Sequence, residues 1–312
     1  MTNKAFLGHG IFLELEPITG LLRYKDYKRP MPPKYTTADL VDKFVGAVID
    51  MKMSSVWFEI FTSSGTIDPK QKLGTPELVA GLKAAKIAAI PWGYCWGENS
   101  EPDPQNPKKV LDLDRAIKLC NDYGLNLFVA DIEPWNENNR GTDKWKDNAL
   151  VDLMTGLNKH FGAENLGISS FALLDQDSQP NARRLIPPIT HLASFCAPQI
   201  YWGGKQDPVQ WAVKSIQSWR NAGVSSDMIA TVQCYWDEHV SQKEMETRVK
   251  KFIASYPDSE WSKIVGLNWY HAGNANEPTD GAMSQDMIDN IIAAKLDMKP
   301  YRRPTSAPTP DA

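Results

Sequence analysis

Eight short segments rich in apolar and β-branched residues follow one another along the chain, with helical patterns between them. The segments span residues 10–17, 55–61, 88–97, 126–135, 165–174, 194–202, 228–236 and 264–271. Most are almost continuously apolar on their N-terminal side, which is typical of parallel strands covered on both faces. Their polar residues gather at the C-terminal ends.

The helical patterns between these segments begin at residues that cap helices. Each start couples a Ser, Thr or Asp to an apolar stripe, and two have proline at the first helical position. The starts are Thr37, Thr75-Pro76, Asp207-Pro208, a capping box of Ser241 with Glu244, and Ser284. The fifth crossover, around residues 181–191, contains Pro187-Pro188 and is the least regular.

Strict alternation of strand and helix predicts a parallel sheet. Eight such units most naturally close into a (β/α)8 TIM barrel of the α/β class, and we expect one barrel domain over residues 1–298. Two smaller domains would also fit a length of 312 residues. A doubly wound open sheet is the other alternative, but no Gly-rich phosphate turn follows the first strand. Residues 299–312 are rich in Pro, Ser and Thr and are expected to form a tail or linker.

Composition narrows the class of partner. The chain is 42% hydrophobic and 23% charged, with a formal net charge of −4 and no dense Lys or Arg run, so we expect no nucleic acid partner. No stretch approaches the length of a membrane span, and we expect no membrane insertion. The N-terminus lacks the apolar run of a signal peptide, so we expect synthesis in the cytoplasm and, for work outside, release by another route. The oligomeric state stays open.

The cysteines and most histidines carry no chemical signal. Cys95, Cys120, Cys196 and Cys234 show no CxxC spacing and are expected to be buried free thiols. Four histidines are expected to be ordinary surface or boundary residues; these are His9, His160, His191 and His239. His271 follows the last strand and is a candidate for binding substrate or pairing with a carboxylate.

Carboxylates end three of the predicted strands. The first strand ends in Glu14-Leu15-Glu16, the second contains Glu59 near its end, and the fourth ends in Asp131-Ile132-Glu133. Barrel active sites lie at the C-terminal ends of the strands, so these acids should converge on one rim. Asp131 and Glu133 share a face about 6–7 Å apart, and crowded carboxylates raise each other's pKa. A neutral acid at the rim is what protonation of a glycosidic oxygen requires. Alternatively, the pair bonds loop amides or pairs with Arg140 or Lys144.

A short repeat ends the sixth and seventh strands, as Gln199-Ile200-Tyr201-Trp202 and Gln233-Cys234-Tyr235-Trp236. The amide and the phenol of each repeat share a face and are candidates for hydrogen bonds to an acetamido group or to sugar hydroxyls. Packing of both tyrosines in the upper layer of the barrel is the alternative.

Several of the 11 tryptophans lie at or near strand ends, where their faces suit stacking on pyranose rings. Plain packing at the barrel mouth remains possible for each of them. We expect the substrate to contact these residues: Glu14, Glu16, Glu59, Tyr94, Trp96, Trp135, Gln199, Tyr201, Trp202, Gln233, Tyr235, Trp236, Asn268, Tyr270 and His271.

Motifs of other enzyme classes are absent from the sequence. It contains no HExxH, Walker A or GxSxG pattern, and Ser169 and Ser170 have no adjacent base that would make a serine nucleophile. We expect no cofactor and no resident metal. One alternative is a divalent-metal sugar isomerase or lyase, whose ligands would be Glu16, Glu59, Asp131, Glu133 and His271.

The segment from Leu127 to Glu133 resembles the strand-end Asp-x-Glu of family 25 lysozymes and, more distantly, the end of the chitinase-type family 18 motif. Trp92-Gly93-Tyr94 and the Gln-x-Tyr strands also resemble the rims of these barrel glycosidases. Two departures stand out: Glu14 and Glu16 occupy the region where family 25 carries a first-strand Asp, and Asn126 and Val129 replace upstream aspartates of family 18.

The resemblance implies that Glu133 is the catalytic acid/base. It implies that Asp131 positions the substrate's N-acetyl group or steadies an oxazolinium intermediate. The sequence therefore predicts a lysozyme-like glycoside hydrolase whose polysaccharide substrate is N-acetylated, most of all peptidoglycan, as for a phage endolysin or an exported wall hydrolase. A carbohydrate-binding barrel without turnover is the alternative from another class.

Overall fold

The structure is a computed structural model of the 312-residue chain. It describes residues 2–13, 34, 36–62, 75–95, 102–103, 106–135, 148–175, 180–203, 206–236, 239–272 and 283–296, with the backbone alone for 102–103 and 106–110. The predicted tail at 299–312 and the acids Glu14 and Glu16 lie outside these ranges.

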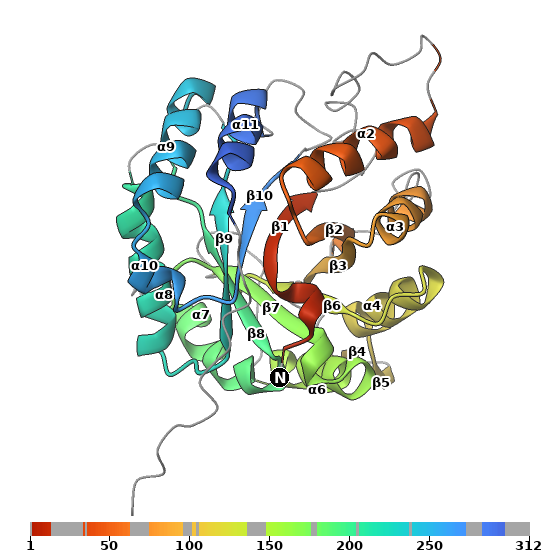
Figure 1. The fold of residues 1–312 in the computed structure, drawn as a ribbon. Helices are drawn as coiled ribbons and strands as arrows, with labels where there is room; N and C mark the ends of the chain where they lie inside the picture. The colour runs from red at the N-terminus through yellow and green to blue at the C-terminus, as the bar shows by residue number, and fades with distance from the viewer. Residues whose placement is uncertain are drawn as a thin grey trace, which may run out of the picture.

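Eight parallel strands form a closed barrel in the order β1-β10-β9-β8-β7-β6-β3-β2 (Figure 1). They are β1 (Gly8–Leu13), β2 (Ser55–Thr62), β3 (Ala88–Cys95), β6 (Phe128–Ile132), β7 (Leu166–Phe171), β8 (Phe195–Ile200), β9 (Asp227–Gln233) and β10 (Gly266–Tyr270). Each overlaps one of the eight predicted segments, so the predicted barrel is confirmed. A two-stranded antiparallel sheet of β4 (Pro102–Asp103) and β5 (Asn106–Val110) lies outside the barrel and was not predicted.

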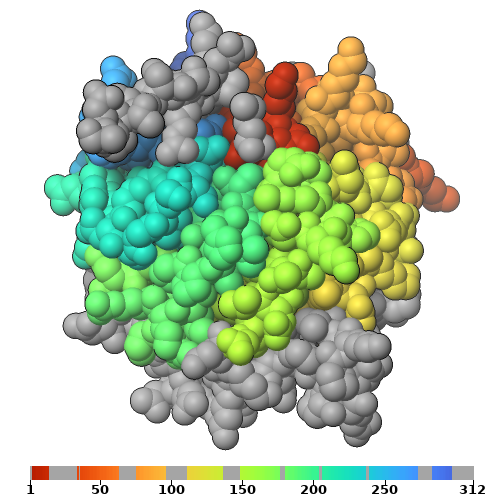
Figure 2. Space-filling view, turned by 90° about the horizontal axis from the view of Figure 1, so that it is seen from below, coloured from red at the N-terminus to blue at the C-terminus, as the bar shows by residue number. Residues whose placement is uncertain are grey.

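Helices surround the barrel and follow the strands in sequence order. The α-helices are α2 (Thr37–Asp50), α3 (Thr75–Ala84), α4 (Leu111–Asp122), α6 (Ala149–Phe161), α7 (Pro180–Leu185), α8 (Pro208–Asn221), α9 (Gln242–Ser255), α10 (Asp258–Trp261) and α11 (Gln285–Ala294). Short 3-10 helices are η1 (Lys4–Phe6), η5 (Ala163–Asn165) and η6 (Pro187–Leu192). Seen from below, the coloured chain runs around the molecule in sequence order (Figure 2). This is the arrangement that consecutive strand–helix units produce.

The helix caps largely follow the sequence. Asp207 and Ser284 accept backbone N–H bonds at the starts of α8 and α11 as predicted. The cap of α2 is Thr36 rather than Thr37, and it forms a complete capping box with Asp39. Only half of the predicted box at Ser241 forms, in which its hydroxyl accepts from the Glu244 N–H. The Glu244 carboxylate instead bonds Arg248 one turn further along α9.

Side chains alternate between two cores. Inward residues of the strands form an inner cluster with Phe6 of η1, and outward residues pack against the helices. Phe6 and Phe195 lie 4.6 Å apart between ring centroids, near the N-terminal end of the barrel. Gly167 leaves room for Phe195, because a Cβ there would lie 1.9 Å from the Phe195 Cζ. The N-terminal part of the barrel interior is therefore filled by side chains. The groups that could react with a substrate lie at the C-terminal ends of the strands.

Of the remaining sequence predictions, some are confirmed and one is wrong. The fifth crossover is indeed irregular, since a six-residue α7 is followed by the 3-10 helix η6. All four cysteines are buried and free, as predicted. The prediction for His9 is wrong: it is 2% exposed, and its Nε2 accepts a hydrogen bond from the indole N–H of Trp269 on the neighbouring strand. No helix in the described ranges has the length and apolar character of a membrane span.

Candidate functional site

Asp131 and Glu133 lie at the carboxyl end of β6, on the inner face of the barrel. Val129 on the same strand belongs to the inner cluster, whereas Ala130 and Ile132 belong to the outer one. Because strand side chains alternate, Asp131 and Glu133 follow Val129 on the inward side. Asp131 is 7% exposed and Glu133, two residues nearer the rim, is partly exposed. Asp131 is therefore the buried acid of the pair, and Glu133 is the more accessible one.

Two neighbouring strands hold Asp131. Its Oδ1 accepts a hydrogen bond of 2.8 Å from the Gln199 Nε2 of β8. The same Nε2 lies 3.3 Å from the Ser169 Oγ of β7, and Ser169 also hydrogen-bonds Asp131. Ser169 is the register partner of Asp131 in the β6–β7 pairing. These three side chains form a closed hydrogen-bonded group across three adjacent strands.

Burial raises the pKa of Asp131 well above its ordinary value. The negative charges of Glu133 and, to a smaller extent, Glu59 raise this pKa further, while the hydrogen bonds from Ser169 and Gln199 lower it. Glu59 of β2 therefore interacts electrostatically with the buried acid of β6. Crowding of this kind disfavours the ionised form of Asp131.

Glu133 is oriented by Trp135. The indole N–H of Trp135 donates to the Glu133 Oε2 at 3.0 Å. The Trp135 ring is held in turn by an edge contact with Phe171, 4.7 Å between centroids. Its backbone carbonyl accepts from the Asn181 side chain at 2.9 Å. Trp135 therefore reaches this site through its indole N–H, which bonds Glu133.

Three tyrosines form an aromatic group beside the acids. Tyr201 and Tyr270 stack at 4.9 Å, and Tyr235 meets both edge-on at 5.8 and 5.9 Å. His271 is buried and stacks on Tyr235 at 5.3 Å. All three tyrosines are partly exposed, so part of each side chain is accessible at the rim. Tyr201 comes directly after β8, two residues beyond the Gln199 that bonds Asp131.

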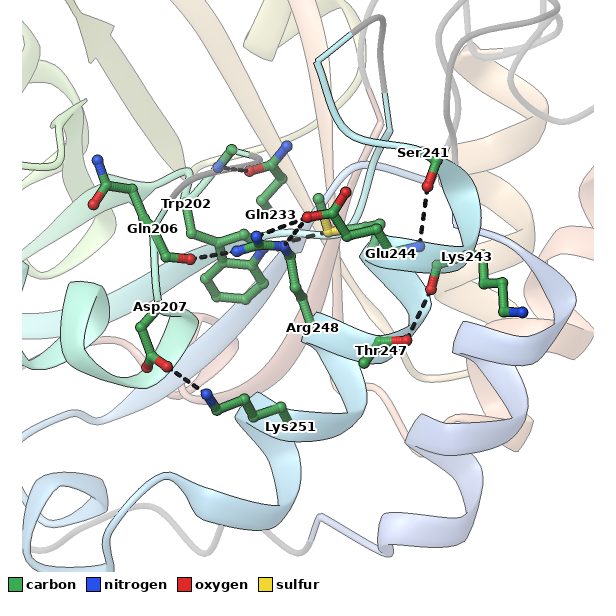
Figure 3. A network of polar contacts seen from close by, with 12 residues as sticks. Trp202, Gln206, Asp207, Gln233, Ser241, Lys243, Glu244, Thr247, Arg248 and Lys251 are labelled. Atoms are coloured by element: carbon green, nitrogen blue, oxygen red, sulfur yellow. Dashed lines mark hydrogen bonds and ion pairs between the residues drawn. The ribbon is translucent and has the colours of Figure 1, made fainter.

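Gln233 supports the loop that follows β8. Its Oε1 accepts the Gly203 backbone N–H at 2.7 Å, and its Nε2 donates to the Tyr235 carbonyl at 3.2 Å. Further along the same loop, Arg248 of α9 donates to the Gln206 carbonyl, and Lys251 pairs with Asp207 (Figure 3). The loop beyond Tyr201 is therefore tied both to the barrel and to α9.

Three of the predicted substrate contacts need correction. Trp202 is fully buried on the outer side of the barrel, where its N–H meets the Met245 sulfur at 3.3 Å and its ring packs on Phe252. Alternation explains this, since Tyr201 points inward. Asn268 is 1% exposed and lies one inward step below Tyr270, so it is below the rim. Gln233 is also 1% exposed, and its amide is used by the Gly203 loop.

The other predicted contacts are placed as follows. Tyr94 is partly exposed and is the register partner of Asp131 on β3. Trp236 is partly exposed and packs against the outer cluster. Glu14, Glu16 and Trp96 lie outside the described residues.

Sequence reasoning missed two members of the site. Ser169 was set aside because no base stands next to it in sequence, yet it hydrogen-bonds the Asp131 carboxyl. Its signal was a hydroxyl on an inward position of an apolar strand. Phe12 packs against Tyr270 at 5.6 Å and Trp92 at 5.8 Å, and nothing in its sequence context separated it from ordinary core. Among the described residues, no group of three or more His, Cys, Asp or Glu side chains is arranged to hold a metal ion.

The sequence matches no protein-family model and no curated protein. Solved structures do resemble the fold. Ostrinia furnacalis Group IV chitinase has a TM-score of 0.58 at 11% identity, over 92% of this chain and 99% of the chitinase. The Bacillus cereus spore cortex-lytic enzyme SleL has a TM-score of 0.57 at 8% identity, over 95% and 76%. A family 10 endo-β-1,4-xylanase from Gloeophyllum trabeum has 0.57 at 11%, over 93% and 96%. At these identities the likeness shows that the chain shares their (β/α)8 barrel fold.

Proposed function

We propose that the protein is a glycoside hydrolase that cleaves an N-acetylated polysaccharide, most of all peptidoglycan. The observation that carries the proposal is the pair of acids at the end of β6. Asp131 is buried and hydrogen-bonded by Gln199. Glu133 is more exposed and is oriented by Trp135. A glycosidase needs an acid that reaches the leaving oxygen and a second group that stabilises the positive charge forming on the sugar.

In the proposed reaction Glu133 gives its proton to the glycosidic oxygen as the bond from that oxygen to the anomeric carbon breaks. The carbonyl oxygen of the substrate's acetamido group then bonds to the anomeric carbon, which gives an oxazolinium ion. Asp131 orients the acetamido N–H and balances the charge of this ion. Glu133, now ionised, takes a proton from water as the water oxygen attacks the anomeric carbon. This attack breaks the bond from the acetamido oxygen to that carbon and opens the oxazolinium ring.

The aromatic rim supplies the proposed binding surface. The phenols of Tyr201, Tyr235 and Tyr270 are suited to hydrogen bonds with sugar hydroxyls or an acetamido oxygen. Trp135 and Tyr94 offer ring faces for pyranose stacking. The structural neighbours include chitinases, a xylanase and a spore cortex-lytic enzyme, which supports a saccharide as substrate.

The decisive experiment compares wild-type protein with Glu133→Gln on purified peptidoglycan, chitin oligomers and plant glycans, with release of reducing ends as the measurement. Loss of the general acid should lower turnover by about 10²–10⁴-fold on the substrate that is cleaved. The control is Glu77→Gln, an exposed glutamate in the first turn of α3. Circular dichroism of both variants checks the fold.

Two results would reject the proposal. One is equal digestion by wild type and Glu133→Gln. The other is tight glycan binding by calorimetry without product from the wild type, which would select the carbohydrate-binding barrel.

A further inference from the structure

The Gln199 amide bonds one particular oxygen of the Asp131 carboxyl, Oδ1. Oδ1 accepts the 2.8 Å bond from the Gln199 amide, which is a group that cannot change its protonation state. In a neutral carboxyl the carbonyl oxygen is a stronger acceptor than the hydroxyl oxygen, so the bond from Gln199 favours Oδ1 as the carbonyl oxygen. A proton on this carboxyl is therefore favoured on Oδ2.

We propose that Gln199, whose amide is held by Ser169, is a positioning residue that keeps Oδ1 of Asp131 as an acceptor, so that a proton bound by this carboxyl resides on Oδ2. Gln199 is 8% exposed and Ser169 is 2% exposed, so water does not compete freely for these bonds. The inference about the proton stands on this geometry. Its bearing on turnover rests on the proposed function.

The orientation of the Gln199 amide follows from the charges around it. Glu133 on β6 and Glu59 on β2 both raise the negative potential at Asp131, and Tyr94 of β3 is its register partner. An amide N–H that faces this potential is favoured over an amide oxygen. Ser169 holds the amide in place, because the Gln199 Nε2 also lies 3.3 Å from its hydroxyl oxygen.

The group also sets how readily Asp131 ionises. Donors to a carboxylate favour its charged form, so the two hydrogen bonds oppose the effect of burial and of the neighbouring acids. Removal of the donors should make Asp131 hold its proton more tightly. In catalysis this would delay the step that needs the ionised carboxylate.

The test measures the ionisation of Asp131 directly, by carbon-13 NMR of protein labelled at the aspartate carboxyl carbons. The Asp131 signal is assigned from its disappearance in Asp131→Asn. Gln199→Met keeps the length of the side chain and removes the donor, and the pKa of Asp131 should rise by about 1 or more. Ser169→Ala is the second variant and should shift it in the same direction.

The matched control is Thr231→Val. Thr231 is fully buried on β9, is the register partner of Gln199, and is not hydrogen-bonded through its hydroxyl within the described part of the chain. This nearly isosteric change alters the same layer of the barrel without touching Asp131, so the titration should stay at the wild-type value.

The outcomes separate the inference from the proposed function. An Asp131 that ionises at the same pH or more readily in Gln199→Met than in the wild type overturns the inference, and it would mean that the amide oxygen faces Oδ1. If the titration shifts as expected but no glycan is cleaved, the positioning role holds and the hydrolase proposal fails. If the wild type is active, the pH profile of kcat in Gln199→Met should shift to higher pH, with little change in KM.

Discussion

Trp135 donates its indole N–H to the carboxylate of Glu133 at 3.0 Å, although the two residues are separated by a single proline. The Trp135 backbone N–H also bonds the Glu133 carbonyl at 2.8 Å, so a tight turn brings the ring back over the acid. One tryptophan therefore fixes both the chain direction after β6 and the orientation of Glu133, the more exposed acid of the Asp131–Glu133 pair.

We predict that Trp135→Phe reduces turnover of the cleaved glycan. Phenylalanine can keep the edge contact with Phe171 but has no donor for Glu133. Loss of a hydrogen bond to a charged acceptor costs about 1.5–3 kcal/mol, which corresponds to a kcat about 10- to 100-fold lower. Steady-state kinetics with Trp211→Phe as control tests this, because the buried Trp211 N–H has no partner among the described residues. An unchanged kcat in Trp135→Phe would remove the orienting role.

Asp131→Asn should make the protein more stable at pH 7. The folded pKa of Asp131 is raised above 3.8, so the unfolded chain ionises before the native protein does. Stability from this residue is therefore present below the unfolded pKa and is lost as pH rises toward the folded pKa. Asparagine mimics the neutral acid and avoids that loss.

Urea unfolding at pH 7 and pH 4 measures the effect, and the gain should shrink at the lower pH. Asp39→Asn is the contrasting variant. Hydrogen bonds from the Thr36 backbone and hydroxyl lower the pKa of Asp39. Loss of the Asp39 carboxylate in this variant should therefore destabilise the protein at pH 7. A variant Asp131→Asn that is less stable than wild type at pH 7 contradicts the assignment of a costly buried acid.

His9 should make the fold sensitive to mild acid. Burial lowers the pKa of His9 from 6.5 to about 4. Between these two pH values, His9 is protonated in the unfolded chain and neutral in the native protein. Stability from the neutral imidazole is complete above pH 6.5 and falls by about 3 kcal/mol as pH drops toward 4. The free energy of unfolding, followed from pH 7 to 4.5, should decline less in His9→Gln. Equal slopes would show that His9 ionises without cost.

Two glycine substitutions should act in opposite directions. Gly167→Ala would place a Cβ 1.9 Å from the Phe195 ring, and overpacking of this kind costs about 1–3 kcal/mol or more. Gly46→Ala lies inside α2 with nothing within 4 Å, and should stabilise the fold by about 0.5–1 kcal/mol. Denaturant midpoints of the two variants check both signs. Equal tolerance at Gly167 would show that Phe195 can move aside.

Much of the molecule follows from local sequence patterns. Apolar strand segments, capped helices and the acids at strand ends predicted the barrel and the shared face of Asp131 and Glu133, because a strand repeats every two residues wherever it lies. The same alternation, applied to the Gln-x-Tyr-Trp repeat, separates Tyr201 from Trp202, which lies on the outer side. The sequence resemblance also indicated which of the two acids should face the substrate.

Barrel closure decided the remaining features. Gln199 stands 68 residues from Asp131, and His9 stands 260 residues from Trp269, so neither pair has a local signature. Which inward positions meet depends on the register between strands. That register is set by packing around the whole barrel, down to the fit of Gly167 against Phe195. The sequence by itself therefore determined the strands and the acids they carry, and the tertiary structure alone decided which partners hold those acids and which aromatic rings reach the rim.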